Sequence, residues 1–263
     1  MNSLMTPRTD APHSRGAVAV RALWTGVAVL LLCILGASRV RDPLAGWPRT
    51  MLWAWERPER LDFLDPHDTG VAFLASTVSL HGDAASVAPR MQPLRVPPAV
   101  RLIAVVRIET RAAALNVAQR DAAVAAIVQA SRLPHVAAVQ VDFDATASQR
   151  LFYRDLLGDL RRQLAPGTPI SITALASWCM YDDWISTLPI DEAVPMLFRM
   201  GTDQRNIQQY LASGQDFRPA VCRHSLGLST DESVAHLPAV RRIYWFNPHS
   251  WNEAALQHIG GDQ

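Results

Sequence analysis

The chain has 263 residues and a formal net charge of +1, a length that suits one large barrel domain. The near-neutral balance argues against a nucleic-acid-binding surface, so we expect no nucleic-acid partner. All 25 basic residues are arginines, which excludes a Schiff-base lysine and a phosphate-loop lysine.

An uncharged apolar run, Ala22–Ala37, lies near the N-terminus and follows Arg8, Arg15 and Arg21. This layout is typical of a secretory signal or a short signal anchor, although the run is slightly shorter than the roughly 20 residues of a membrane span. A cleaved signal, an anchor helix and a buried core helix all remain open. We expect export to the cell envelope, either to the periplasm or anchored in the inner membrane and facing the periplasm.

This interpretation divides the chain into four parts. They are an n-region at 1–21, a signal anchor or signal peptide at 22–37, a linker at 38–50 and a barrel domain at 51–263.

Short apolar runs with turn signals between them predict eight strands after the linker. They are Leu52–Glu56, Gly70–Ser76, Leu102–Ile108, Val136–Asp142, Ile170–Ala174, Ala193–Phe198, Ser225–Leu228 and Arg242–Phe246. Eight strands in about 210 residues favour an α/β fold, a single (β/α)8 TIM-like barrel, over the alternative of a doubly wound open sheet.

Helical periodicity predicts helices at Leu115–Arg132, Ala147–Leu164 and Gln204–Ser213. The connection Thr77–Pro98 differs, because it contains Gly82, four prolines and alternating apolar residues. It predicts an extended hairpin in place of a helix, so the helix ring of the barrel should be incomplete.

The run Val139–Asp144 places two carboxylates on one face of a strand, because strand side chains alternate. The Cα atoms of Asp142 and Asp144 should lie roughly 6.6 Å apart. Two anions this close raise each other's pKa or recruit a cation or a hydrogen-bonding ligand.

Working residues of barrel enzymes lie at the C-terminal ends of the strands and in the following loops. Carboxylate pairs catalyse glycoside hydrolysis, and indole rings stack on sugars. The candidate catalytic residues are Asp142, Asp144, Glu109 and Glu56. The candidate ligand-binding residues are Trp55, Trp178, Asp182, Arg107, Arg199, Trp245 and Asn247.

Structural roles compete with these assignments. Asp142 and Asp144 could be ion-paired by Arg107 or Arg199, and Trp53 and Trp55 could pack outward against the helices. His224 and His249 could add metal ligands, but no HxH or HExxH spacing occurs, so we expect no metal. We also expect no cofactor, since no glycine-rich nucleotide motif is present. A serine hydrolase is disfavoured by the lack of a GxSxG elbow.

Cys179 and Cys222 are the cysteines outside the N-terminal apolar run. An exported protein could oxidise this pair. The predicted strands place the two residues at opposite ends of the barrel, so we expect them to remain unbridged.

Four stretches resemble a bacterial family known as domain of unknown function 3142. They are Leu52–Arg57, Val139–Asp144, Ile170–Leu175 and the segment Asp191–Val194, and the resemblance covers nearly everything after residue 50. This family carries no established activity, so the resemblance implies a domain but no reaction.

The order of parts is also distantly similar to chitinase-type glycoside hydrolase barrels. These carry Asp-x-Asp-x-Glu after the fourth strand, and Asp142 and Asp144 match the two aspartates. Thr146 stands where the resemblance would require the acidic glutamate, and Met196–Arg199 lacks the expected tyrosine and aspartate. Trp245 resembles the tryptophan that forms the sugar-binding floor.

Two functions remain open at this point. One is a glycoside-hydrolase-like envelope enzyme with a relocated acid, in which Asp144 pairs with Glu109 or Glu56. The other is a non-catalytic barrel that binds a glycan or an envelope partner through the same cleft. A carbohydrate ligand is expected in either case.

Overall fold

The computed structural model describes Met1 and residues 43–112, 114–239 and 241–261. These residues form one unit from position 43 onward, and the predicted apolar segment Ala22–Ala37 lies outside them. Within this described part of the chain, no helix is long and apolar enough to cross a membrane.

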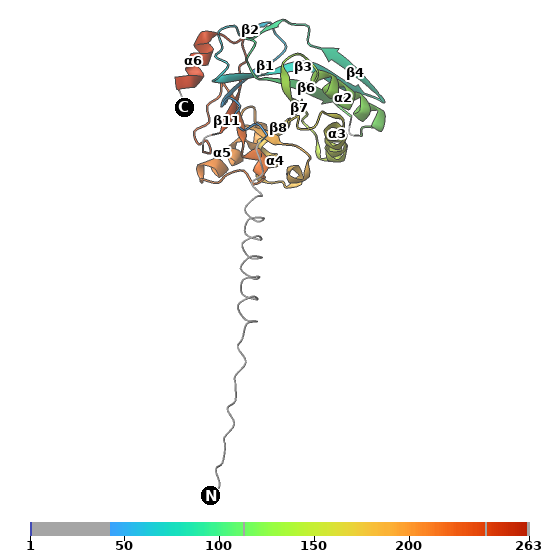
Figure 1. The fold of residues 1–263 in the computed structure, drawn as a ribbon, viewed down its shortest axis with the longest axis vertical. Helices are drawn as coiled ribbons and strands as arrows, with labels where there is room; N and C mark the ends of the chain where they lie inside the picture. Colours follow the sequence, from blue (N-terminus) through green and yellow to red (C-terminus); the bar gives the residue numbers. More distant parts are fainter. Residues whose placement is uncertain (2–42, 113, 240, 262–263) are drawn as a thin grey trace. The chain divides into compact units, whose positions relative to one another are not determined.

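Eight parallel strands form a closed barrel (Figure 1). The first strand, β1, pairs with both β3 and the last strand, β11, and the strands between them follow in chain order. This closure excludes the open doubly wound sheet. The barrel strands are β1 (Thr50–Ala54), β3 (Thr69–His81), β6 (Leu102–Thr110), β7 (Val136–Asp142), β8 (Ile170–Leu175), β9 (Glu192–Met196), β10 (Ser225–Ser229) and β11 (Arg242–Phe246).

All eight predicted strands are present, with ends that shift by a few residues. The largest shift is in β3, which continues to His81 and turns back at Gly82 into the antiparallel strand β4 (Ala84–Pro89). The extended hairpin predicted at Thr77–Pro98 is therefore confirmed. Two short strands, β2 (Glu59–Arg60) and β5 (Leu94–Arg95), pair beside it.

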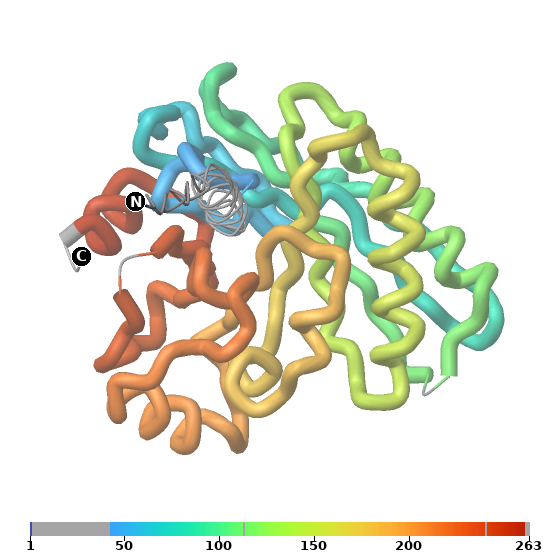
Figure 2. The backbone as a smooth tube through the Cα atoms, turned by 60° about the horizontal axis from the view of Figure 1, so that its bottom comes forward, coloured from blue at the N-terminus to red at the C-terminus, as the bar shows by residue number. Residues whose placement is uncertain are grey.

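Helices cover only part of the barrel. The three predicted helices correspond to α2 (Val117–Ala130), α3 (Arg150–Gln163) and α5 (Gln204–Ala212). Figure 2 shows α2 and α3 side by side. Short helices α4 (Ala176–Met180) and α6 (Glu253–Gly261) and the 3-10 turns η1 (Ala147–Gln149), η2 (Trp184–Thr187), η3 (Gly201–Asp203) and η4 (Ala220–Cys222) complete the set.

Trp53 lies inside the barrel, which corrects the prediction that it packs outward. It belongs to an interior cluster with Met51 and Tyr244, closed by Leu44. A Cβ on Gly227 would lie 2.9 Å from the Trp53 ring, so the indole needs a glycine on the interior face of β10, two strands away. Odd-numbered residues of β1 therefore face the interior, and Trp55 follows Trp53 on that face.

A hydrogen-bonded polar network crosses the interior beneath Trp53. The Trp53 indole donates to Gln140 Oε1 (2.8 Å), and Gln140 donates to Ser171 Oγ (3.0 Å). Ser171 donates to Glu192 Oε2 (2.8 Å), whose other oxygen is 2.7 Å from Arg242 Nη1. The buried Glu192 charge is therefore paired, as burial of a carboxylate requires.

Cys179 and Cys222 form a disulfide, with Cα atoms 6.1 Å apart, so the prediction that they stay unbridged is wrong. The error came from treating both cysteines as strand termini. Cys179 lies within α4 and Cys222 within η4. The Arg218 N–H also donates to the Cys179 carbonyl (2.9 Å), which brings these two connections together outside the strands.

Candidate functional site

The site begins where β6 and β7 end. Arg107 on β6 is in register with Asp142 on β7, so the two side chains share the interior face of neighbouring strands. Strand β6 continues to Thr110, and Glu109 lies on the same face as Arg107, two residues farther along the strand. Alternation along two parallel strands therefore gathers one arginine and two carboxylates at the C-terminal mouth of the barrel.

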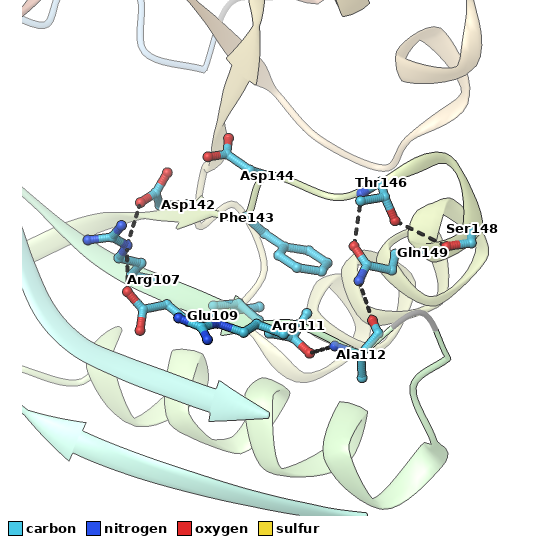
Figure 3. Close-up of a pocket in the computed structure, with 12 residues that line it drawn as sticks. Arg107, Glu109, Arg111, Ala112, Asp142, Phe143, Asp144, Thr146, Ser148 and Gln149 are labelled. Carbon is cyan, nitrogen blue, oxygen red and sulfur yellow. Dashed lines mark hydrogen bonds and ion pairs between the residues drawn. The ribbon is translucent and has the colours of Figure 1, made fainter. Parts of the chain in front are cut away.

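Arg107 bridges the two carboxylates. Its Nε is 3.2 Å from Glu109 Oε1 and 3.7 Å from Asp142 Oδ2 (Figure 3). The Asp142 side chain is 14% exposed, whereas Arg107 and Glu109 are 44% and 48% exposed. Asp142 thus contacts the arginine at the buried base of the site, whereas Glu109 is exposed to solvent.

The pKa of Asp142 is raised above its ordinary value, chiefly because burial disfavours the charged form. The Thr173 hydroxyl opposes this shift by donating to Oδ1 (2.7 Å). The Asp144 charge raises the pKa, Arg107 lowers it, and Glu109 raises it again. The pKa of Asp142 therefore depends on its burial and on the charges of Asp144, Arg107 and Glu109.

Asp144 lies just beyond β7 and is exposed. Desolvation raises its pKa and Arg107 opposes that shift. Within the described residues, no ion pair or hydrogen bond engages its side chain. Among Asp142, Asp144 and Glu109, Asp144 is thus the carboxylate that remains available to a ligand.

Two adjoining cavities, of about 540 and 460 Å³, share Arg107, Asp142 and Asp144 in their walls. We refer to them together as the mouth cleft. The larger is also lined by Glu109, and Figure 3 shows Asp144 and Glu109 on different sides of it. Their combined size is within the range of small-ligand sites.

Aromatic side chains line the smaller cavity of the mouth cleft. Phe198 and Phe246 stack with ring centroids 5.5 Å apart and planes within 6°, and Trp55 lines the same cavity. The Arg199 guanidinium lies 4.8 Å from the centre of the Phe246 ring. The mouth cleft therefore combines a carboxylate side with an aromatic side.

Comparison with known families matches a segment that contributes part of this cleft. Residues 99–198 match the family model described as Domain of unknown function (DUF3142). The match confirms the resemblance from the start of β6 to Phe198 and contains Arg107, Glu109, Asp142 and Asp144. The stretch Leu52–Arg57 lies outside it. No curated protein matches the chain.

One matching stretch of the DUF3142 segment has a structural role. Asp191 accepts from the Ile170 N–H (2.8 Å) and from Arg161 Nη2 (2.6 Å). It thereby connects the starts of β8 and β9 to α3. Asp142 and Asp144 differ from it in facing a cavity.

Several predicted site residues lie elsewhere. Trp178 is buried and packs edge-on against Trp184, with ring centroids 5.1 Å apart. Asp182 pairs with Arg150 at 2.5 Å. Neither lines the mouth cleft, although Ala176 and Ser177 at the start of α4 do.

Glu56, which follows β1, and Asn247, which follows β11, also lie outside the cleft. Glu56 is exposed and lines a smaller cavity with Arg90, at the base of the β3–β4 hairpin. Asn247 accepts from the Thr230 hydroxyl and the His249 N–H, both at 3.1 Å, and so fixes a turn. Trp245 faces outward, because the interior residues of β11 are even-numbered.

Arg199 lines the cleft but does not pair with the β7 carboxylates. It lies 3.3 Å from Asp231, and its backbone N–H donates to Glu232 (3.0 Å). Its φ of +50° is in the left-handed region, which is uncommon for a non-glycine residue. Arg107 and Arg199 were both candidates for the ion pair with Asp142, and the structure places Arg107 there.

The sequence interpretation missed Thr173, Phe198 and Phe246. Thr173 could have been found by extending strand alternation to β8, where it is in register beside the polar face. To predict Phe246, one would have to know which residues of β11 face the interior. Only the structure reveals this, through the buried pairing of Arg242 with Glu192. Within the residues that the structure describes, no group of three or more His, Cys, Asp or Glu side chains is arranged to hold a metal ion.

Proposed function

We propose that this protein is a glycoside-hydrolase-like enzyme of the cell envelope, built on a TIM-type (β/α)8 barrel, that acts on a glycan bound in the mouth cleft. The supporting observation is the Arg107 bridge, which holds Glu109 and Asp142 beside the free carboxylate of Asp144. Paired carboxylates on two sides of a cleft are the arrangement that glycosidic cleavage needs.

In this proposal Asp144 is the general acid. A raised pKa keeps a carboxyl protonated at higher pH, and its exposure lets it reach a glycosidic oxygen. Glu109 is the base or nucleophile, since it lines the same cavity as Asp144 and is held in place by Arg107. Asp142 positions Arg107. The aromatic side, Trp55 and Phe246, offers flat apolar faces for sugar rings.

Location in the envelope is part of the proposal. The Cys179–Cys222 disulfide supports an oxidising compartment, where such bonds persist. The apolar run Ala22–Ala37 would supply a signal or a membrane anchor, with Arg8, Arg15 and Arg21 on its cytoplasmic side.

The test is hydrolysis of a panel of envelope and storage polysaccharide fragments by the full-length protein. Loss of the general acid or base should lower turnover roughly 10²–10⁴-fold, so Asp144→Asn and Glu109→Gln should both be inactive while still binding the fragment. Glu56→Gln is the matched control, since Glu56 lies outside the mouth cleft. Equal loss in Glu56→Gln, or full activity in Glu109→Gln, would refute the assignment.

A non-catalytic glycan-binding barrel is the second candidate. It is favoured by the engagement of Glu109 and Asp142 with Arg107, because a carboxylate held by a guanidinium can serve as a fixed hydrogen-bond acceptor. Ligand-dependent thermal stabilisation without product from any fragment, abolished by Arg107→Gln, would support this alternative over the enzyme.

A further inference from the structure

A second cavity lies on the outer wall of the barrel, over β10 and β11. Its volume of about 960 Å³ exceeds that of either cavity of the mouth cleft. It is lined by outward residues of the two strands, among them Leu226, Leu228, Ile243 and Trp245. We refer to this cavity as the outer groove.

The outer groove exists because the connection between β10 and β11 contains no helix in its described residues, 230–239. Val234 and Leu237 of this connection and Ile259 of α6 form its cover. Leu237 remains 43% exposed although it is apolar. Protein interiors are close-packed, so an apolar space this large beside the barrel wall is suited to an occupant.

Trp245 provides an independent sign of a ligand. Its side chain is 9% exposed and lines the outer groove, and its buried Nε1 has no hydrogen-bond partner among the residues that the structure describes. A buried N–H normally finds an acceptor, because leaving it unpaired is costly. An oxygen atom of an occupant would satisfy it.

Charge is distributed unevenly along the outer groove. Arg49 precedes β1 and Arg241 precedes β11, so both lie at the N-terminal end of these parallel strands. Arg241 already pairs with Asp216, whereas the exposed Arg49 side chain has no ion-pair partner in the described part of the chain. At the other end, Asp231 pairs with Arg199. Among the described residues, Glu232 at that end accepts only a hydrogen bond from the Arg199 backbone N–H. The Asp231 end of the outer groove is therefore anionic, and the unpaired positive charge is at the Arg49 end.

These features select a small molecule over a protein helix. Leu226 and Leu228 are only 1% and 5% exposed, so the cover already lies close above the strands. A helix is about 10–12 Å wide and would have to displace that cover. A single chain along five residues of strand, roughly 16 Å long, is much narrower and needs only a small outward shift of the cover.

We propose that the outer groove binds an anionic single-chain amphiphile, a fatty acid that carries an oxygen function along its chain. The carboxylate lies at Arg49, the apolar chain lies against Leu226, Leu228 and Ile243, and the chain oxygen accepts from Trp245 Nε1. This site shares no lining residue with the mouth cleft and is independent of the glycan proposal.

Photolabelling of the full-length protein in its membranes tests this proposal. The probes are a fatty acid with a mid-chain hydroxyl and a photoreactive tail, its hydroxyl-free counterpart and the matching neutral alcohol. Peptide mapping should place the acid label on residues 225–246 or on α6. Labelling confined to other peptides, or equal labelling by the neutral alcohol, would overturn the proposal.

Two variants assign the contacts. Arg49→Gln should lower groove labelling by both acids roughly two- to fivefold, whereas Arg154→Gln, an exposed arginine on α3, should leave it unchanged. Trp245→Phe should remove a roughly two- to tenfold preference for the hydroxyl-bearing acid. Because Arg49 is exposed, its substitution does not threaten folding. Labelling that is indifferent to Arg49, or no hydroxyl preference in the parent protein, refutes the assigned contacts.

Discussion

The barrel wall formed by β6 and β7 is covered by α2 and α3, whereas the wall formed by β10 and β11 is covered by α6 and an irregular connection. On the first wall, α3 contributes Leu156, Leu157 and Leu160, all fully buried, and Arg120 of α2 pairs with Asp155 and Asp159 of α3. On the second wall, apolar strand residues line a cavity.

The difference matters for where chemistry can be placed. A well-packed wall fixes strand positions, and side chains at the ends of such strands can be held in defined geometry. The Arg107 bridge lies at the end of the packed wall. The loosely covered wall offers an apolar space, which suits binding rather than a precise arrangement of charges.

The largest effect should distinguish the packing of the two walls. Leu156→Ala removes a fully buried side chain between α3 and the barrel and should cost about 4 kcal/mol, within the range of well-packed sites. Leu228→Ala borders an existing cavity and should cost about 2 kcal/mol. Urea denaturation of both variants measures the difference. Equal losses would show that the outer groove is packed as tightly as the α3 interface.

The disulfide joins two of the connections that cover the barrel. It closes a loop with a sequence separation of 43, so Cys222→Ser should lower the free energy of unfolding by about 2–4 kcal/mol. Denaturation with and without reductant checks this. The variant should be insensitive to reductant and the parent protein sensitive. A parent protein unaffected by reductant would mean that the bond does not form.

Gly227 tests the interior of the loosely covered side. Gly227→Ala places a Cβ 2.9 Å from the Trp53 ring, and overpacking of this kind costs about 1–3 kcal/mol. Gly158→Ala on α3 is a matched control, because its nearest neighbour is the tip of Arg162 at 3.6 Å. Thermal unfolding of the pair should show a loss only in Gly227→Ala. A neutral Gly227→Ala would mean that Trp53 can move away from β10.

The strands could be predicted because apolar runs and turn residues mark them locally. For β7 and β11 both ends agree with the prediction. The facing of each strand could not be predicted as well. Trp53 and Trp245 are both tryptophans in apolar runs, yet one faces the interior and the other the outer wall. Their facing depends on the Gln140 amide and the Glu192–Arg242 pair, which are separated by many residues in sequence.

The candidate site shows the same limit. Asp142, Asp144, Arg107 and Glu109 could be grouped from alternation alone, because register between adjacent strands follows from the barrel. Glu56, Trp178 and Asp182 could not be excluded, since each lies in the connection that follows a strand. The path of such a connection depends on contacts such as that of Arg150 with Asp182. The prediction of site residues therefore failed mainly in the connections between strands and helices.

The smallest effect concerns the charges at the mouth cleft. The pKa of Asp144 is raised in the folded protein, so folding favours its protonated form. Its contribution to stability is fully present below the unfolded pKa, near 4, and is lost as pH rises through the raised folded pKa. Asp144→Asn has no carboxyl to ionise, so its stability should not decrease in this way as the pH rises. Since Arg107 pairs with Glu109 and Asp142, the substitution leaves no guanidinium without a partner.

Asp144→Asn should therefore be as stable as the parent protein or more stable at pH 7, and the advantage should disappear as the pH falls towards 4. Arg107→Gln is the opposing control: it leaves Asp142 and Glu109 without their shared cation, so it should be less stable at pH 7 than at pH 4 relative to the parent protein. Melting temperatures across this pH range measure both. A pH-independent loss in Asp144→Asn would mean that Asp144 is a structural ion-pair partner, and the mouth cleft would then lack its free carboxylate.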